Sequence, residues 1–464
     1  MRTGGPPVVN CALPYGDERL EVTLPARTRV VAGLAERMGG RTEGVEPLGD
    51  EAAAVREALA HPLGMPRLAE MLRPSSRVLI AFDDPTVVSY GPFRRLAIEA
   101  LLEEIAAAGV VESNVTLLCA NALHRRWTRE ELASVLGEEL VRRFGERLLC
   151  HDGEDAYGLV YLGQTPSGYD VEVNRLVADC DLTVYVNAQV HLGFSGGWKS
   201  VCVGLSTWRS IRWTHTPHGT SMSMRDNRMH AVLDEMGAHL ESALGKRVFK
   251  IETVTAGLTR AARVWAGAVS ETRAAALEFM LPRYPARRSL AEPADVIIYG
   301  VPNWSPYATF ARMNPILTLI STGLGYLGGY IEALGKPGCS VIMATPCTEQ
   351  WDLEHHLAYP EVWARVLPET RDPYEITERY IEKFAANDFY IENYRFGYSY
   401  HPVHAVLATH PLKRLGHAGR VFVAGADDAA VPRHLGFIPA SSVEDAVREA
   451  ERIHGRDCSI TCVA

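Results

Sequence analysis

The sequence lacks the features that mark several classes of protein. It contains no internal repeat, no low-complexity segment and no apolar h-region after Met1, so we expect no secretory signal. Lys and Arg total 47 against 56 Asp and Glu, and the resulting net charge of -9 argues against a general nucleic-acid binder. The most apolar long stretch, residues 316–334, is interrupted by glycines and a glutamate. It predicts buried core instead of a membrane span.

Cysteine is sparse and scattered. The nine cysteines form no C-x-x-C pair, and the nearest two are Cys458 and Cys462. This spacing is typical of reduced thiols, and it favours neither a disulfide framework nor a cysteine metal site. We therefore expect a cytoplasmic protein that binds neither membrane nor nucleic acid.

Strands and helices alternate along the 464 residues, which is enough chain for two or three domains. Such alternation predicts an α/β fold with mainly parallel sheets. A break near 280–293 suggests two α/β domains, 1–280 and 290–464, with an active-site cleft between them. Buried strands are predicted at 78–82, 115–120, 182–187, 294–300, 340–344 and 420–424. Helices are predicted at 94–108, 128–146 and 441–453, the second opening with a capping box from Thr128 to Glu131.

The most informative segment follows the strand at 182–187. A glycine-rich loop, Gly193-Phe194-Ser195-Gly196-Gly197, precedes a helix that carries Lys199 in its first turn. Small residues allow backbone N–H groups to approach an anion, and a helix N-terminus favours negative charge. The loop is neither a Walker A motif nor a G-x-G-x-x-G fingerprint. It predicts a site for a phosphate-bearing cofactor, with a purely structural turn as the alternative.

The same segment resembles the nickel-pincer lactate racemases. The resemblance centres on G-F-S-G-G-x-K at 193–199, followed sixteen positions later by His215. It extends over nearly the whole chain. Further matching segments are Asp84-Pro85-Thr86, Ala122-Leu123-His124-Arg125, 162–168, 300–302, 347–349 and 436–439.

The resemblance implies a cofactor. In this family a pyridinium-3-thioamide-5-thiocarboxylic acid mononucleotide is joined to a lysine and holds nickel through two sulfurs and a ring carbon. Lys199 matches the linking lysine and His215 the histidine that completes the nickel coordination. Soft sulfur donors with an imidazole suit nickel(II). Cofactor-synthesis enzymes are implied partners. The other positions that the resemblance assigns to cofactor binding are Asp84, Thr86, Ser195, Gly196 and Gly197.

The resemblance also implies a reaction, the inversion of a hydroxyl-bearing carbon by reversible hydride transfer. A base must remove the hydroxyl proton, and histidine has a suitable pKa. His124 matches one of the two catalytic histidines, but the other matching position is Gln189, whose amide is no base. Since His191 would face the same side of an extended strand, we expect it to replace that histidine. Catalysis with a single histidine is the alternative.

The substrate-binding pattern departs from that of the family. An arginine that would grip a carboxylate is expected at Val87, and the usual Gln and Lys are not found near Thr309. We therefore expect a racemase or epimerase acting on a larger 2-hydroxy acid, a sugar acid or a sugar, and not on simple lactate. The alternatives are a pincer-dependent oxidoreductase or isomerase of a specialised pathway, and a non-catalytic paralogue that binds the cofactor or nickel. Arg312 is the candidate to replace the lost lysine, and the candidates for a shifted clamp are Arg94, Arg95, Arg125 and Arg126.

Overall fold

The computed structural model shows a mixed α/β protein with mainly parallel sheets, as predicted. Its described residues separate into two compact units. The first unit holds those within 38–284 and 385–403, and the second holds those within 1–37, 285–384 and 404–464. The described residues are 7–33, 44–87, 91–188, 193–220, 223–283 and 290–464.

This division differs from the expected domains 1–280 and 290–464. The N-terminal strand β3 (Arg29–Val31) joins the second unit because it pairs in parallel with β16 (Ile460–Val463) near the C-terminus. Helix α15 (Asp388–Phe396) joins the first unit, where the Tyr394 hydroxyl accepts a hydrogen bond from the Gly153 N–H at 2.9 Å. Both pairings connect segments hundreds of residues apart, so no local pattern in the sequence indicates them.

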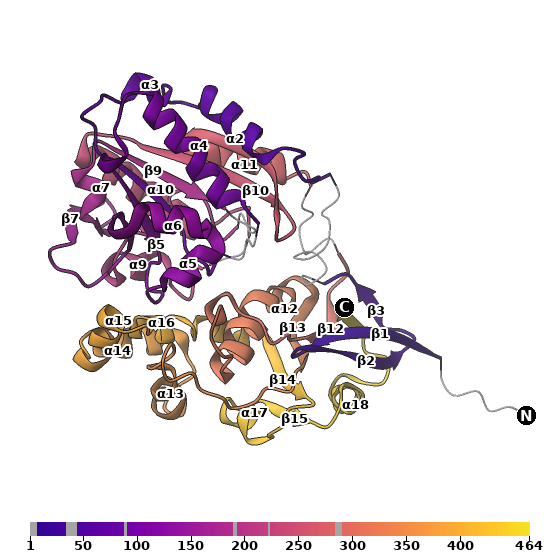
Figure 1. Ribbon diagram of the computed structural model, residues 1–464. Coiled ribbons are helices and arrows are strands. Elements are labelled where there is room, and N and C mark those ends of the chain that lie inside the picture. The colour runs from indigo at the N-terminus through magenta and orange to yellow at the C-terminus, as the bar shows by residue number, and fades with distance from the viewer. Residues whose placement is uncertain (1–6, 34–43, 88–90, 189–192, 221–222, 284–289) are drawn as a thin grey trace, which may run out of the picture. The chain divides into compact units, whose positions relative to one another are not determined.

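The first unit is built on a six-stranded sheet (Figure 1). Strand β11 runs antiparallel to β10, and all the other neighbouring pairs are parallel. The strand order is β11 (Arg260–Ala268), β10 (Val248–Ala256), β9 (Leu182–Asn187), β4 (Val78–Asp83), β5 (Val115–Ala120), β6 (Leu148–Cys150). Hairpin β7–β8 (Leu159–Gln164, Asp170–Asn174) forms a separate pair.

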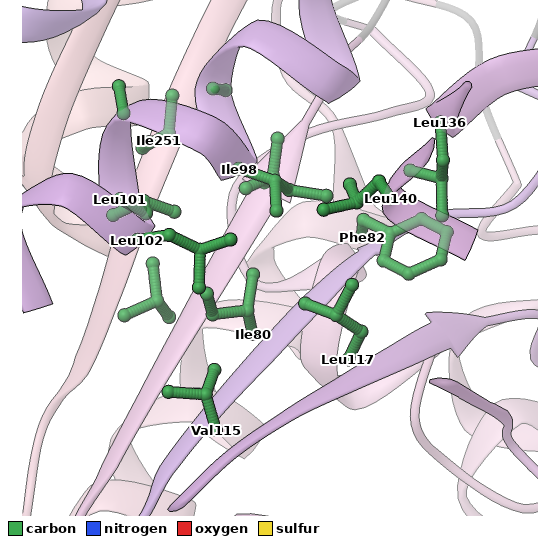
Figure 2. Close-up of a cluster of buried hydrophobic side chains, with 14 of the residues drawn as sticks. Ile80, Phe82, Ile98, Leu101, Leu102, Val115, Leu117, Leu136, Leu140 and Ile251 are labelled. Atoms are coloured by element: carbon green, nitrogen blue, oxygen red, sulfur yellow. The ribbon is translucent and has the colours of Figure 1, made fainter. Parts of the chain in front are cut away.

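The core of this unit lies between the sheet and a layer of helices. Figure 2 shows Ile80 and Phe82 of β4 and Leu117 of β5 meeting Ile98 and Leu101 of α4. Each such side chain contributes about 1.5–3 kcal/mol when fully buried. Helices that supply residues to this core are α2 (Glu51–Ala60), α3 (Leu68–Met71), α4 (Phe93–Ala107), α5 (Arg129–Leu136) and α6 (Glu138–Phe144). The remaining helices of the unit are α7 (Arg175–Asp179), α8 (Lys199–Cys202), α9 (Trp208–Thr214), α10 (Arg228–Leu244), α11 (Val269–Met280) and α15.

Local sequence signals account for several boundaries. The predicted capping box is present, with the Thr128 hydroxyl accepting from the Glu131 N–H and the Glu131 carboxylate accepting from the Thr128 N–H. The single helix expected over 128–146 is wrong, because Gly137 adopts φ +81° and divides it into α5 and α6.

The second unit contains a parallel six-stranded sheet. Its order is β15 (Ile438–Ala440), β14 (Ala418–Ala424), β13 (Gly335–Ala344), β12 (Ala294–Gly300), β16, β3. Hairpin β1–β2 (Val8–Tyr15, Glu18–Pro25) and α18 (Val443–His454) share a hydrophobic core with this sheet. The other α- and π-type helices that lie wholly or mainly in this unit are η5 (Ile316–Leu327), η6 (Val362–Val366), α12 (Gly329–Leu334), α13 (Tyr359–Glu361), α14 (Pro373–Ala385), α16 (Pro402–Leu407) and α17 (Ala430–His434).

Two further expectations concern apolar segments and thiols. Helix η5, within the apolar stretch at 316–334, is almost entirely buried, as predicted. Among the described residues, no helix has both the length and the apolar character needed to cross a membrane. All nine cysteines lie in described segments and are free thiols, as expected.

Candidate functional site

The predicted site residues of the first unit gather at one edge of its sheet. Strands β9, β4 and β5 are parallel neighbours, so their carboxyl ends lie side by side. Asp84 follows β4, the turn at 121–124 follows β5, and Asn187 ends β9. The carboxyl ends of strands in such sheets are the usual position of ligand sites.

Asp84 and His124 form a hydrogen-bonded pair at this edge. The Asp84 side chain is 2% exposed, and its Oδ2 lies 2.8 Å from Nδ1 of His124, whose side chain is 19% exposed. Thr86 Oγ1 donates to Asp84 Oδ1 at 2.6 Å, and Trp127 Nε1 donates to Oδ2 at 3.2 Å. An ionised carboxylate accepts hydrogen bonds only, so Nδ1 carries the proton and the imidazole lone pair is on Nε2. This arrangement is that of an oriented general base.

The turn that carries His124 is strained and is held from a distance in sequence. Ala122 has φ +49°, an unfavourable value for a residue with a Cβ. Its carbonyl accepts a hydrogen bond from the Tyr394 hydroxyl at 3.2 Å, and the Leu123 carbonyl accepts one from the His401 N–H at 3.0 Å. The Tyr400 ring lies 5.6 Å from the His124 ring. The sequence contains no indication of these contacts with the turn, because residues 394–401 have no motif and follow the turn by about 270 positions.

Asp83, next to Asp84, forms hydrogen bonds with residues at the end of β9 and not with His124. It is buried, and burial raises the pKa of its carboxyl group. The carboxylate accepts hydrogen bonds from the Tyr185 hydroxyl at 2.9 Å, from the Ala188 N–H at 2.8 Å and from the Asn187 amide. Asp83 therefore joins the end of β4 to the end of β9.

The glycine-rich loop is attached to β10 by a buried ion pair. Lys250 Nζ and Glu252 Oε2 are 2.9 Å apart, and both side chains are fully buried. Glu252 accepts the N–H of Gly197 at 3.0 Å, while Lys250 donates to the Gly197 carbonyl at 2.7 Å and to Ser200 Oγ at 2.8 Å. Both backbone groups of Gly197 are therefore engaged with the protein.

These contacts change the interpretation of the loop. The Gly197 N–H is already accepted by the Glu252 carboxylate, so this group is engaged within the protein, and an anion site formed by the loop stays a prediction. The following helix α8 has only four residues, so little helix dipole is available. Gly197 adopts φ +55°, and a Cβ there would lie 2.4 Å from Cδ of Arg273, which donates to the Ser195 carbonyl at 3.0 Å. The Gly196 carbonyl accepts the N–H of Lys199 at 3.3 Å.

Lys199 and His215, the predicted anchor and metal ligand, both contact Phe194. Lys199 Nζ lies 3.9 Å from the centroid of the Phe194 ring, and the His215 ring meets that ring edge-on at 5.9 Å. Burial lowers the pKa of Lys199 to about 8, although the charges of Asp83 and Asp84 oppose the shift. About a tenth of this amine is therefore neutral and nucleophilic at pH 7.

A neighbouring hydroxyl orients the imidazole of His215. Thr214 Oγ1 donates to the Ile211 carbonyl at 2.9 Å and lies 2.9 Å from Nδ1 of His215. The hydroxyl hydrogen is thus used, so Nδ1 donates to Oγ1 and the lone pair of the ring is on Nε2. Metal-binding histidines are typically oriented in this way. His218, a nearby alternative, is exposed and contacts Arg228.

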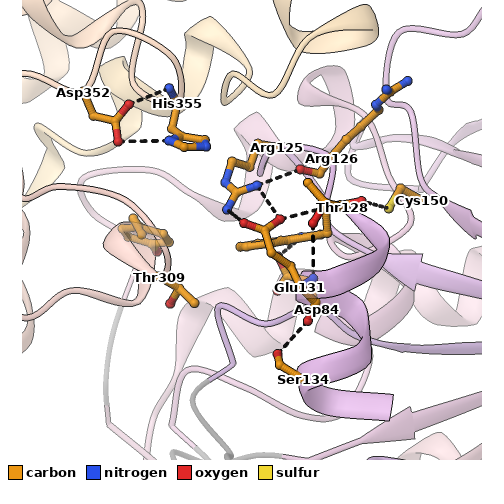
Figure 3. A network of polar contacts seen from close by, with 12 residues as sticks. Asp84, Arg125, Arg126, Thr128, Glu131, Ser134, Cys150, Thr309, Asp352 and His355 are labelled. Carbon is orange, nitrogen blue, oxygen red and sulfur yellow. Dashed lines mark hydrogen bonds and ion pairs between the residues drawn. The ribbon is translucent and has the colours of Figure 1, made fainter. Parts of the chain in front are cut away.

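Arg94 and Arg125 are not available as carboxylate clamps. Both are fully buried. Arg94 donates to the carbonyls of Asp83 and Asp84 at 3.0 and 3.2 Å. Arg125 forms a bidentate pair with Glu131 at 3.0 and 2.7 Å, shown in Figure 3.

The other three arginines are less constrained. Arg95 pairs with Glu99 at 3.1 Å, and Arg126 donates to the Arg395 carbonyl at 3.1 Å. Arg312 is an exposed residue of the second unit, where its backbone N–H donates to Asp352 at 3.2 Å. Gln189 and His191, the two positions considered for the second base, lie outside the described residues. In the described part of the chain, no cluster of three or more His, Cys, Asp or Glu side chains is arranged to hold a metal ion.

Comparisons with known proteins agree with the resemblance inferred from the sequence. Residues 15–227 match the family described as lactate racemase N-terminal domain. A lactate racemase of Thermoanaerobacterium thermosaccharolyticum is 28% identical over 234 residues, which cover 48% of this chain and 52% of that protein. A lactate racemase of Lactiplantibacillus plantarum is 28% identical over 189 residues, covering 39% and 43%. The matches thus span about half the length of these relatives.

Two solved structures share the fold. The lactate racemase apoprotein from T. thermosaccharolyticum superposes with a TM-score of 0.67 at 21% identity, covering 98% of both chains. A protein from Thermotoga maritima gives a TM-score of 0.52 at 16% identity, covering 88% of this chain and 95% of its own. The family match over 15–227 includes Asp84, His124, Lys199 and His215.

Proposed function

Because the chain is a diverged relative of the lactate racemases, we propose that it is a racemase or epimerase of a hydroxyl-bearing carbon. Its substrate is a 2-hydroxy acid larger than lactate, a sugar acid or a sugar. It works in the cytoplasm with a nickel-pincer mononucleotide linked to Lys199, supplied by cofactor-synthesis enzymes. The observation that carries the proposal is the contact of Lys199 and His215 with one aromatic ring, Phe194.

The residues present fit this cofactor. An acyl link to Lys199 requires a neutral amine, and burial supplies one by lowering the pKa of Lys199 to about 8. The lone pair on Nε2 of His215 suits nickel(II) that takes its remaining donors from sulfur and carbon of the cofactor. When bound, the cofactor supplies a reversible acceptor for hydride.

His124 and Asp84 provide the proton transfer that must accompany movement of a hydride. Nε2 of His124 accepts the hydroxyl proton of the substrate, and the Asp84 carboxylate stabilises the imidazolium through Nδ1. In a two-base inversion, a second base returns the proton to the oxygen of the inverted product. We assign the second base to His191. The hydrogen-bonded pair of His124 and Asp84 favours an enzyme over a non-catalytic cofactor-binding paralogue.

The arginines favour a substrate other than lactate. The clamp position of the family is occupied by Val87, and the nearby guanidinium groups of Arg94 and Arg125 are engaged by protein carbonyls and by Glu131. A small hydroxy acid bound mainly through its carboxylate would lose its strongest contact. A larger substrate with several hydroxyl groups can bind through other polar contacts.

The decisive experiment is intact-protein and peptide mass spectrometry with nickel analysis, after co-expression with the cofactor-synthesis enzymes. We expect a mass increment on the peptide containing Lys199 and near-stoichiometric nickel. Lys199→Ala should lose both, whereas His215→Ala should keep the increment and lose nickel. Turnover is then screened with hydroxy acids, sugar acids and sugars. An unmodified Lys199, under conditions that load a lactate racemase control, would contradict the proposal.

A further inference from the structure

A buried histidine near the proposed cofactor site has no task in the mechanism above. His230 lies in the first turn of α10 and is 5% exposed. Neither of its ring nitrogens has a hydrogen-bond partner anywhere in the described residues. Leaving a buried polar group unpaired is costly, and folded proteins rarely do so without a reason.

His151 shows how the same unit normally buries an imidazole. His151 follows β6 and is fully buried. Its Nε2 lies 2.9 Å from the Ser206 carbonyl, and its Nδ1 lies 3.1 Å from the Asn174 amide nitrogen. Both nitrogens are therefore satisfied by the protein, which is the opposite of the situation at His230.

The turn that carries His230 is fixed against the Lys199 loop. Asn227, the N-cap of α10, accepts the His230 N–H at 3.3 Å and donates to the carbonyl of Gly193, the first residue of the loop. Farther along α10, Gly237 packs so closely on Trp198 that a Cβ would lie 2.0 Å from its ring. The helix therefore contacts the loop at its first residue and again immediately before Lys199.

The surroundings keep the His230 imidazole neutral. Burial and the positive charges of Arg273, Lys199 and Lys250 lower its pKa to about 2. A neutral imidazole offers one N–H donor and one lone-pair acceptor. It matches an uncharged polar group, such as the N–H or the carbonyl-type acceptor of an amide.

We propose that His230 is a binding residue for the acyl group attached to Lys199, and that it forms a hydrogen bond with a polar atom of this amide-type linkage. This inference rests on the proposed function, because it assigns His230 to the ligand carried by Lys199. In this proposal the ligand provides the hydrogen-bond partner that the described residues do not provide to the His230 ring. Its hydrogen bond forms when Lys199 is modified.

Two matched substitutions test the proposal, His230→Leu and His151→Leu, each made in loaded and unloaded protein. Without the cofactor-synthesis enzymes, His230→Leu should leave Tm unchanged or raise it by roughly 2–4 °C, since it removes an unpaired polar group. His151→Leu should lower Tm, since it leaves the partners of His151 unpaired. After co-expression, wild-type protein should gain thermal stability with the adduct. His230→Leu should lose most of this gain and carry less Lys199 adduct, and His230→Gln should recover part of both.

The opposite results would overturn the inference. If His230→Leu lowers the unloaded Tm as much as His151→Leu does, His230 has a structural role. If it keeps the wild-type adduct level and the wild-type gain in Tm, His230 does not contact the ligand. Absence of the adduct in wild-type protein would contradict the proposed function instead. The assignment of His230 to this ligand would then fall with it, whatever the Tm of the unloaded variants.

Discussion

The carboxylate of Asp84 controls which nitrogen of His124 carries a proton, because it lies 2.8 Å from Nδ1 and can only accept. In Asp84→Asn, the amide NH₂ can donate to Nδ1 and shift the proton of the ring to Nε2, where it blocks proton acceptance. We expect kcat to fall by roughly 10²–10⁴-fold. The Lys199 adduct should remain. Steady-state kinetics on the substrate found in the screen, together with peptide mass, will measure both.

Thr86→Val provides the control for this experiment. It removes the hydroxyl that donates to Asp84 Oδ1 at 2.6 Å and lies 3.1 Å from Nδ1 of His124, but it keeps the carboxylate that faces His124. Its effect on kcat should be much smaller than that of Asp84→Asn. Equal losses in the two variants, or loss of the adduct in Asp84→Asn, would show that Asp84 acts on the cofactor instead of orienting His124.

At the scale of elements, the buried Lys250–Glu252 pair of β10 holds the glycine-rich loop at 193–197 through hydrogen bonds to Gly197. Removing Lys250 takes away the nearest opposite charge of the buried Glu252 carboxylate, so Lys250→Met should lower the free energy of unfolding by about 3–5 kcal/mol. The double variant Lys250→Met/Glu252→Leu should recover part of that loss, because the charge of Glu252 is removed together with that of Lys250. Urea denaturation of the unloaded protein measures both changes.

The amount of Lys199 adduct in these variants shows whether the pair affects the geometry of the loop in addition to the stability of the protein. The double variant lacks the acceptor for the Gly197 N–H and the donor to the Gly197 carbonyl. It should therefore load Lys199 poorly even where its stability is restored. If Lys250→Met is as stable as wild type, or if the double variant loads fully, the pair does not organise the loop.

At the scale of elements, the sequence predicted the bounds of strands and helices better than the contacts between segments far apart in the chain. Strands 115–120, 182–187 and 294–300 were expected with the observed bounds, because continuous apolar runs between turn residues are local signals. The capping box at Thr128 is equally local. The contacts of Gly197 could not be predicted, because they come from a strand more than 50 residues later. The motif indicated a loop between β9 and α8, but it gave no sign that the Gly197 N–H is accepted by Glu252.

In the whole molecule, the chain passes repeatedly between two units, which explains why a single boundary near 280–290 was an incomplete prediction. Pairing of β3 with β16 and packing of residues 385–403 against the first unit are long-range events. They leave no periodicity in the sequence. Their consequence is that the turn carrying His124 depends on residues near position 400.

Tyr394→Phe tests this dependence. Tyr394 is buried, and its hydroxyl joins the Ala122 carbonyl to the Gly153 N–H, so its removal leaves two backbone groups without this partner at a cost of about 1–3 kcal/mol. The strained turn should open more often, and hydrogen exchange should accelerate in peptides covering 119–124 while 294–300 in the other unit stays unchanged.

Tyr380→Phe is the matched control for Tyr394→Phe, since Tyr380 lies on α14 of the second unit and its hydroxyl contacts Glu369 there. It should leave exchange at 119–124 as in wild type. Because His124 is the proposed base, Tyr394→Phe should also lower kcat without reducing the Lys199 adduct. Unchanged exchange at 119–124 in Tyr394→Phe would mean that the first unit holds its catalytic turn without the late segment. Faster exchange at 294–300 would mean that the two units respond as one body to a contact made within only one of them.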